Sequence, residues 1–203
     1  MKITRIFIYF FLSFFLNTNH SFSNDFNEWL ISFNKFALQQ GISKQTLDKT
    51  MLKVKYLPKV IEYDRYQPEF YEDTKTYISK RTSDKKLDRG ILLYKKNNLL
   101  INKIENKYNI EKELLLSLMG IETNFGTYLG KMDILSSLAT LSFDKRRSEF
   151  FTNELIIALK LIDNEVIDND VLFGSWAGAF GNFQFMPSTI NNYAVDYNND
   201  KFI

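Results

Sequence analysis

The sequence predicts a mainly helical, globular fold. Hydrophobic residues make up 45% and charged residues 25% of the 203 residues, which excludes a largely disordered chain. Apolar residues recur at the 3.6-residue spacing of helices in several segments, and no segment alternates strongly between apolar and polar residues as a half-buried strand does. The length suits one domain, or one domain with a small lobe.

Residues 1–23 are predicted to be a secretory signal peptide. Lys2 and Arg5 precede an apolar run over residues 6–16, and small residues follow at Ser21 and Ser23, so we expect export and cleavage after Ser23. The alternative is an uncleaved membrane anchor, although the run is shorter than the about 20 residues of a membrane-spanning helix. We expect a periplasmic protein without a lipid anchor, because the chain has no Cys.

The predicted mature chain, residues 24–203, carries no excess charge. Lys2 and Arg5 belong to the 26 basic residues of the whole chain, and their removal leaves 24 basic residues against 24 acidic ones. This balance argues against a polybasic protein that binds nucleic acid.

Two helices are expected at the start of the mature chain. Asp25 can cap the first helix, and Gly41 suits the position just after its end. The apolar residues that follow the helical period in this segment are Phe26, Trp29, Leu30, Phe33 and Ala37. Ser43 can cap a second helix, which continues through Leu47, Met51 and Val54.

The middle of the chain predicts three further helices. An irregular stretch is expected over residues 58–70, followed by a short helix over 72–81 and a long helix that begins at Asp84. One face of the long helix is apolar through Leu87, Ile91, Tyr94, Leu99, Ile101, Ile104 and Tyr108. Residues 111–121 are apolar in all directions, which predicts a helix buried on every side.

The last part of the chain predicts an amphipathic helix over residues 147–162 and a polar loop over 164–173. The chain stops at Ile203 without a cap or a polar tail. We therefore expect a C-terminal truncation.

Residue types that are absent restrict the chemistry. Without Cys, disulfides, thiolate nucleophiles and Cys-ligated metals are excluded. A single His, His20, leaves no His-based metal site and no Ser-His-Asp triad. Acid–base chemistry must therefore come from Asp, Glu, Lys or Tyr.

Glu122 is the first candidate for that chemistry, because it closes the apolar run of residues 114–121. A carboxyl at the end of a buried helix loses hydration, which favours its protonated form. A protonated carboxylic acid is what a general acid requires. The alternative is a structural Glu that accepts hydrogen bonds from backbone N–H groups or lies in solvent.

The segment from Gly174 to Ser188 is the second candidate. Three of the eight glycines fall within eight residues here, with aromatic and amide side chains between them. Aromatic rings stack on the faces of sugars, and amides and hydroxyls bond sugar hydroxyls. A tight crossing of helices would also require small residues, so both interpretations stay open.

These two segments and several others resemble the membrane-bound lytic murein transglycosylase B family. The strongest blocks are ETNFG at residues 122–126 and GSWAGAFGNFQFMPS at residues 174–188. Further matching blocks are residues 26–30, 41–43, 64–70, 89–90, 120–121, 138–144, 146–151 and 193–196. The resemblance covers essentially the whole predicted mature chain.

The resemblance implies an α+β, lysozyme-like fold, that is, a helical catalytic domain over residues 24–203 with a small, truncated second lobe. It implies that Glu122 is the catalytic acid and base. The residues that it implies in substrate binding are Ser175, Gln184, Met186, Arg146, Arg147 and Tyr77. The arginines could instead be a solvated helix start, and Tyr77 could be ordinary core packing.

The implied reaction cleaves the β-1,4 bond between N-acetylmuramic acid and N-acetylglucosamine in peptidoglycan. One Glu would first protonate the glycosidic oxygen and then deprotonate the sugar's own C6 hydroxyl, which gives a 1,6-anhydro product. The alternatives are a hydrolytic muramidase and a weak or inactive fragment that only binds glycan.

The resemblance implies no required cofactor. Asp196, Asn198 and Asp200 place oxygen donors at alternate positions, as in a calcium-binding loop, but Lys201 replaces the expected Gly and no later carboxylate follows. A structural calcium ion or a simple polar turn are both compatible with this pattern. The implied partners are peptidoglycan strands and cell-wall synthesis proteins, with the chain itself a monomer.

Overall fold

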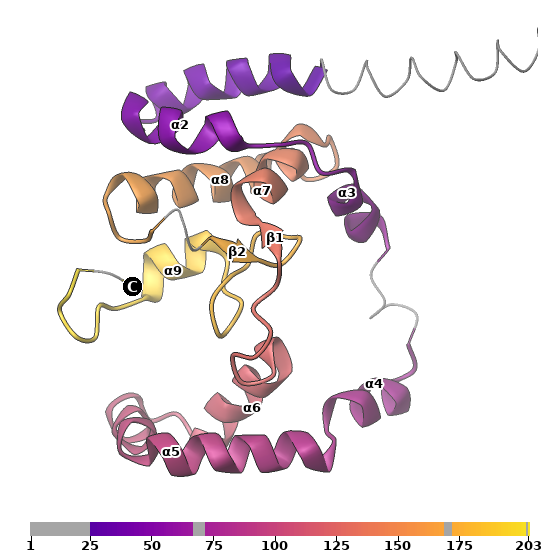
Figure 1. The fold of residues 1–203 in the computed structure, drawn as a ribbon, viewed down its shortest axis with the longest axis vertical. Helices are drawn as coiled ribbons and strands as arrows, with labels where there is room; N and C mark the ends of the chain where they lie inside the picture. The colour runs from indigo at the N-terminus through magenta and orange to yellow at the C-terminus, as the bar shows by residue number, and fades with distance from the viewer. Residues whose placement is uncertain (1–24, 67–71, 169–171, 202) are drawn as a thin grey trace, which may run out of the picture.

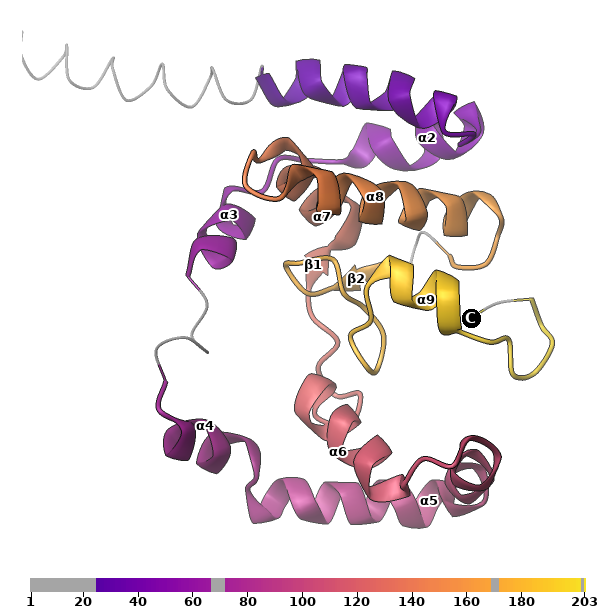
Figure 2. The same ribbon diagram turned by 180° about the vertical axis from the view of Figure 1, so that it is seen from behind.

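The computed structural model describes residues 25–66, 72–168, 172–201 and 203. The predicted signal peptide lies outside these residues, as do parts of the stretches 58–70 and 164–173. The described chain forms two parts (Figures 1 and 2). The upper part contains most helices, and the lower part is formed by α4 (Thr74–Arg81), α5 (Asp84–Tyr108) and α6 (Lys112–Thr123). None of the helices within these ranges combines the length and apolar character that crossing a membrane requires.

The upper part begins with a helix over residues 25–39, which confirms the first expected helix. Phe26, Phe33 and Ala37 are buried, and Gly41 follows with φ +89°, a conformation that favours glycine. The next helix, α2 (Lys44–Thr50), is capped by Ser43, whose side chain accepts a hydrogen bond from the Thr46 backbone N–H. A 3-10 turn, η1 (Met51–Lys53), continues it.

The expectation of an irregular stretch from Pro58 is wrong for its first half, because α3 (Pro58–Arg65) is a helix. Proline at the first helical position loses no hydrogen bond, and its ring already holds the helical φ. Val60 and Asp64, four residues apart, form the buried face of α3. The short helix expected next is confirmed as α4 (Thr74–Arg81), which begins at Asp73 as its N-cap.

The core lies between α7 (Ile134–Phe143) and α8 (Ser148–Asp163). Nearly every residue of α7 is buried, whereas α8 buries one face, as its amphipathic pattern predicts. α9 (Pro187–Tyr193) packs on α8, and α3 packs on α7. The Glu154 carboxylate in α8 is buried and accepts hydrogen bonds from the backbone N–H and hydroxyl of Ser188 in α9.

A second link ties α2 to the end of α8. The Asp163 carboxylate accepts hydrogen bonds from the hydroxyls of Ser43 and Thr46, each at 2.5 Å, and from the Ser43 backbone N–H at 3.2 Å. These bonds favour the charged carboxylate and lower the pKa of Asp163.

A short two-stranded sheet joins the chain that follows Glu122 to the start of the glycine-rich segment. β1 (Met132–Asp133) pairs antiparallel with β2 (Phe173–Gly174), with Met132 opposite Gly174. The sequence did not indicate these strands, because two residues are too short to show alternation. The Asp133 side chain also caps α7, accepting from the Ser136 backbone N–H at 2.7 Å.

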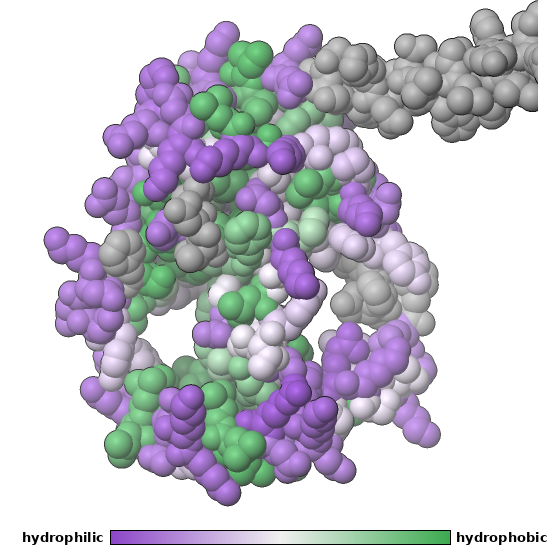
Figure 3. All heavy atoms as spheres, viewed as in Figure 1, coloured by the Kyte–Doolittle hydropathy of each residue, from purple (hydrophilic) through white to green (hydrophobic). Residues whose placement is uncertain are grey.

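The lower part consists of α4, the long helix α5 (Asp84–Tyr108) and α6 (Lys112–Thr123). The long helix is confirmed, although its backbone departs from helical geometry at Asn97. The expectation that α6 is buried on every side is wrong, because Leu114, Leu118 and Ile121 are exposed by 45–53%. α6 packs against α5, and within the described ranges its other apolar face lies at the surface. Figure 3 shows hydrophobic residues gathered at the lower end of the molecule, where α5 lies in Figure 1.

Candidate active site

A pocket of about 310 Å³ lies where the end of α6 meets the glycine-rich segment. It contains three of the residues that the sequence analysis selected, namely Glu122, Ser175 and Gln184. The other lining residues are Tyr63, Tyr128, Gly130, Lys131, Met132, Gly174 and Trp176. Residues from α3, α6, the 124–132 connection and the glycine-rich segment thus meet in one place.

The sequence after Glu122 ends α6 sharply. Asn124, Phe125 and Gly126 all have positive φ, of 50°, 61° and 76°. A left-handed residue after the last turn is a common helix stop, and the Asn124 backbone N–H donates back to the Gly120 carbonyl at 3.2 Å. Glu122 therefore lies in the last turn of the helix, beside the pocket.

Phe125 fixes this turn against the lower part. A Cβ added at Gly120 of α6 would lie 2.7 Å from the Phe125 ring, and one added at Gly90 of α5 would lie 3.1 Å from it. The ring therefore occupies the space that side chains at both positions would need. Glycine at these two positions lets the Phe125 ring pack directly against both helices.

Glu122 is exposed, so the expectation that its helix buries it is wrong. The cause is the arrangement of α6, which packs on α5 and leaves its last turn open toward the pocket. The carboxyl nevertheless lies in the same pocket as Ser175 and Gln184. The structure thus gives Glu122 the neighbours that the sequence analysis expected, without the expected loss of hydration.

The glycine-rich segment forms two tight turns. The Ser175 backbone N–H donates to the Ala179 carbonyl at 2.8 Å, and the Ser175 hydroxyl accepts from the Ala179 N–H at 3.0 Å. Gly178, between them, has φ +94°, and a Cβ there would lie 2.3 Å from the Leu138 side chain. Close packing and turn geometry both require glycine here.

The second turn positions Gln184 at the edge of the pocket. Phe180 and Phe185 exchange two backbone hydrogen bonds of 3.1 Å across it. Gln184 has φ +48°, and its side-chain Nε2 donates to the carbonyls of Leu129 at 3.1 Å and Gly181 at 3.0 Å. The amide group is therefore held between the turn and the connection that follows α6.

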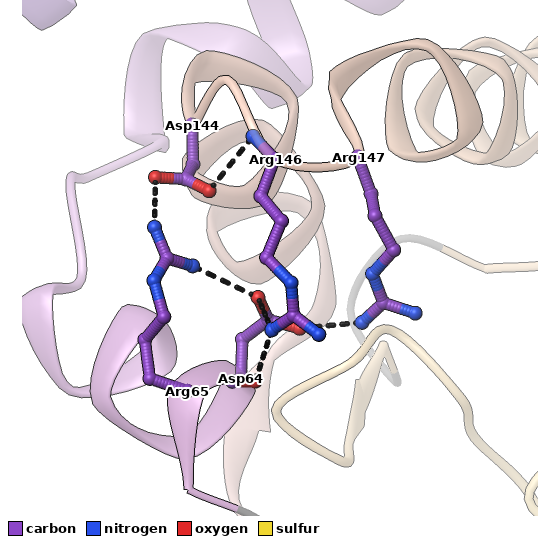
Figure 4. A network of polar contacts seen from close by, with 5 residues as sticks. All are labelled: Asp64, Arg65, Asp144, Arg146 and Arg147. Atoms are coloured by element: carbon purple, nitrogen blue, oxygen red, sulfur yellow. Dashed lines mark hydrogen bonds and ion pairs between the residues drawn. The ribbon is translucent and has the colours of Figure 1, made fainter.

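Arg146 and Arg147 lie outside the lining of this pocket and bind the buried carboxylate of Asp64 (Figure 4). The Asp64 side chain is only 1% exposed, and it also accepts from Arg65 Nη1 at 3.0 Å. Arg146 Nη1 lies 2.8 Å from Asp64 Oδ2. Arg65 Nη2 donates to Asp144 at 2.9 Å, and this bond lowers the pKa of the Asp144 carboxyl.

This network holds α3 against the loop between α7 and α8. Tyr63, which lines the pocket, directly precedes Asp64 on α3. The arginine pair therefore supports a pocket wall, while the two arginine side chains remain 42–47% exposed.

Two other predicted residues also lie away from the pocket lining. Tyr77 lies on α4 beneath the guanidinium of Arg81, with 3.6 Å from Arg81 Cζ to the ring centre. Met186 is the N-cap residue of α9 and packs against the hydrophobic core. The structure therefore does not bring either residue together with Glu122 in this pocket.

Four pocket residues with aromatic or basic side chains were not individual candidates in the sequence: Tyr63, Tyr128, Lys131 and Trp176. Trp176 lies inside the glycine-rich block, and Tyr128 and Lys131 follow the ETNFG block within five residues. Their aromatic and basic character could have indicated a site for a planar-faced, acidic ligand. Tyr63 carried no such signal, because its segment was expected to be irregular.

A larger pocket of about 520 Å³ lies between α5 and α6. Its lining is mainly apolar, and it includes Leu87, Ile91 and Leu116. Its carboxyl residue, Glu113, lies 3.5 Å from the ammonium group of Lys112. Glu122 is absent from its described lining, so the smaller pocket is the better candidate for chemistry.

The loop after α9 does not fit a calcium site well. The Asp196 carboxylate accepts hydrogen bonds from the backbone N–H groups of Asp200 and Lys201, at 3.2 and 2.8 Å, and the Asn198 amide donates to Asp200. Lys201 does adopt a positive φ, 76°, where glycine was expected. Three side-chain donors fall short of the six to eight oxygens that calcium takes, and the described ranges contain no group of three or more His, Cys, Asp or Glu suited to a metal.

Comparison with known proteins gives a consistent result. A family model described as "Transglycosylase SLT domain" matches residues 25–203. Membrane-bound lytic murein transglycosylase B of Escherichia coli (strain K12) is 37% identical over 128 residues, which is 63% of this chain and 36% of that protein.

Solved structures agree with this match. SltB3 from Pseudomonas aeruginosa, in complex with NAG-NAM-pentapeptide, matches with a TM-score of 0.83 and 33% identity, over 87% of this chain and 47% of that chain. The Escherichia coli lytic transglycosylase Slt35 in complex with calcium matches with a TM-score of 0.74 and 30% identity, over 89% of this chain and 57% of that chain. These matches confirm the lysozyme-like, mainly helical fold class, and the chain spans between about a third and three fifths of the relatives named here.

Proposed function

Because the chain belongs to the transglycosylase SLT domain family, we propose that it cleaves peptidoglycan glycan strands with Glu122 as its catalytic acid and base. The observation that supports this most directly is the pocket that Glu122 shares with Ser175 and Gln184. These three residues come from the two blocks on which the resemblance to the family is strongest. The bound NAG-NAM-pentapeptide of the relative SltB3 is the same class of substrate.

The pocket lining suits an amino sugar. Tyr63, Tyr128 and Trp176 offer ring faces on which a sugar can stack. Ser175 and Gln184 offer a hydroxyl and an amide for its polar groups. Lys131 adds a positive charge that attracts the carboxylates of the peptide stem on muramic acid.

Glu122 would first donate its proton to the glycosidic oxygen, while positive charge develops at C1 of the muramic acid. Since Glu122 is exposed, the bound glycan would itself displace the water around the carboxyl. Stacking of the sugar on the aromatic side chains would cover the carboxyl in this way.

The second step would use the same residue as a base. Glu122 is the single carboxyl residue of the described pocket lining, whereas retaining glycosidases place a second carboxylate about 5 to 5.5 Å away as nucleophile. The C6 hydroxyl of the substrate can take that role, because it is already tethered next to C1. Glu122 would remove its proton, and the product would be a 1,6-anhydro end.

The cleavage requires no cofactor, and no step is assigned to a metal ion. We further propose that residues 24–203 act in the periplasm after removal of residues 1–23, as the signal pattern in the sequence indicates. Arg146 and Arg147 would contribute through α3, by holding Tyr63 at the pocket, and through their partly exposed side chains, whose remaining guanidinium donors can pair with stem carboxylates.

The experiment is digestion of purified sacculi followed by mass spectrometry of the released fragments. Wild-type protein should release muropeptides with 1,6-anhydro ends, and Glu122→Gln should release none while its circular dichroism spectrum stays unchanged. The matched control is Glu113→Gln, which should retain activity. Glu113 is an exposed carboxyl on the same helix, and it lies outside the lining of the pocket that contains Glu122.

Other products would identify the rival functions. Reducing ends would indicate a muramidase that uses water, and binding to sacculi without release would indicate a glycan-binding fragment. Anhydro products from Glu122→Gln at the wild-type rate would refute the role of Glu122.

A further inference from the structure

The residue after Glu122 has an unusual set of contacts for a helix end. Thr123 is 1% exposed, and its hydroxyl lies 2.7 Å from the Asn182 carbonyl and 3.2 Å from the Met119 carbonyl of its own helix. The same oxygen accepts a hydrogen bond from the Gly126 backbone N–H at 3.0 Å. Since a hydroxyl has one proton, the short contact with Asn182 is its main donation.

This bond joins two segments that are 59 positions apart in the sequence. Thr123 belongs to α6 in the lower part, whereas Asn182 lies in the glycine-rich segment of the upper part, between Ser175 and Gln184. The Asn182 side chain also lies close to Gly126, where an added Cβ would lie 2.7 Å from Asn182 Oδ1. The contact therefore lies between the end of α6 that carries Glu122 and the segment that carries Ser175 and Gln184.

The exposed apolar face of α6 makes this link important. α6 packs against α5 on one side, and its other face is at the surface of the described structure. A helix held from one side can shift along its partner unless its end is fixed. Displacements of about 1 Å at a catalytic group can reduce a rate by about 100-fold.

We propose that Thr123 is a positioning residue, whose hydroxyl fixes Glu122 relative to the substrate-binding turn at Ser175 and Gln184. This inference rests on the proposed function of Glu122. It assigns Thr123 no contact with substrate, because Thr123 is buried behind the pocket and is absent from its lining.

The test compares three variants. Thr123→Val keeps the shape of the side chain and removes the hydroxyl, whereas Thr123→Ser keeps the hydroxyl. Thr50→Val is the matched control, because Thr50 is equally buried and its hydroxyl donates to the Thr46 carbonyl within α2, which contributes no residue to the pocket lining.

With digested sacculi, Thr123→Val should lower kcat by about 10- to 100-fold and change KM by less than about threefold, because every side chain that lines the pocket is still present. Thr123→Ser should retain most of kcat, and Thr50→Val should retain all of it. An unchanged kcat in Thr123→Val would overturn the proposal, and so would an equal loss in Thr50→Val.

Amide hydrogen exchange gives a second measurement that does not depend on activity. In Thr123→Val, exchange should become faster at Gly126 and over residues 178–185, and Thr123→Ser should restore the wild-type rates. Unchanged exchange in Thr123→Val would overturn the link. If the wild-type protein released no muropeptide, the proposed function would fail, but the exchange comparison would still decide whether Thr123 holds the two segments together.

Discussion

Replacing Asp64 with Asn should destabilise the protein strongly, because its buried carboxylate is the centre of three arginine contacts. The amide side chain would keep one acceptor oxygen, lose the charge and place an NH₂ group among arginine donors. Breaking a buried ion pair costs about 3 to 5 kcal/mol, while exposed pairs contribute about 0.2 to 1 kcal/mol. The Asp64 carboxylate is 1% exposed, but the three arginine side chains are 42–47% exposed. The expected loss of unfolding free energy therefore lies between the lowest value for exposed pairs and the highest value for buried pairs, at about 2 to 4 kcal/mol.

For a protein of this size, the corresponding decrease in Tm is roughly 5 to 15 °C. Urea and thermal unfolding followed by circular dichroism would measure both quantities. Asp144→Asn is the matched control, because Asp144 accepts from the Arg65 side chain and the Arg146 backbone N–H at the edge of the same network. It should cost about 1 kcal/mol. Surface substitutions usually change the unfolding free energy by no more than about 0.5 kcal/mol. A change for Asp64→Asn within that range would refute the view that this network holds α3 in place.

Two further predictions concern packing and pH. Gly120→Ala should destabilise the protein by about 1 to 3 kcal/mol, because its Cβ would lie 2.7 Å from the Phe125 ring. Chemical denaturation of the variant would measure this loss of stability. An unfolding free energy equal to that of wild type would mean that the ring moves freely. Hydrogen bonds, first that from the Ser43 hydroxyl, lower the pKa of Asp163 in the folded protein. The charged Asp163 carboxylate therefore stabilises the fold fully above pH 3.8, its ordinary pKa, and this stabilisation is lost as the pH falls through the lower pKa of the folded state. Acid unfolding of Asp163→Asn should therefore depend less steeply on pH below about 4, and identical titration curves would contradict this.

Helices whose signals are local were predictable from the sequence. Ser43 caps α2 as expected, and the amphipathic pattern of residues 147–162 corresponds to α8. These signals depend on neighbouring residues in the chain, so they survive without knowledge of the tertiary structure. Pro58 was misinterpreted because proline stops a helix in its interior but favours the first helical position.

Burial was less predictable, because it depends on which elements pack against one another. Leu114 and Leu118 make α6 apolar on several faces, yet both are exposed. Their hydrophobicity predicted a covered helix, but within the described ranges only part of that helix is covered. The expectation that Glu122 is buried failed for the same reason.

The candidate site was predictable where it follows two contiguous blocks. Glu122, Ser175 and Gln184 meet in one pocket as expected. Arg146 could not be placed in the same way, because its interaction with Asp64 spans 82 positions and depends on how α3 packs. Tyr63 was missed for a related reason, because it reaches the pocket lining only when α3 packs against α7.

The ring of Phe125 limits which residues can occupy positions 90 and 120. An alanine Cβ would lie 2.7 Å from the ring at position 120 and 3.1 Å from it at position 90, so a smaller residue at 125 would relieve the contact at both positions. This is a steric form of epistasis that spans 35 positions of the chain. Relatives with a small residue after the ETN tripeptide would be free to carry alanine or serine in both helices, whereas relatives with an aromatic ring there would retain both glycines.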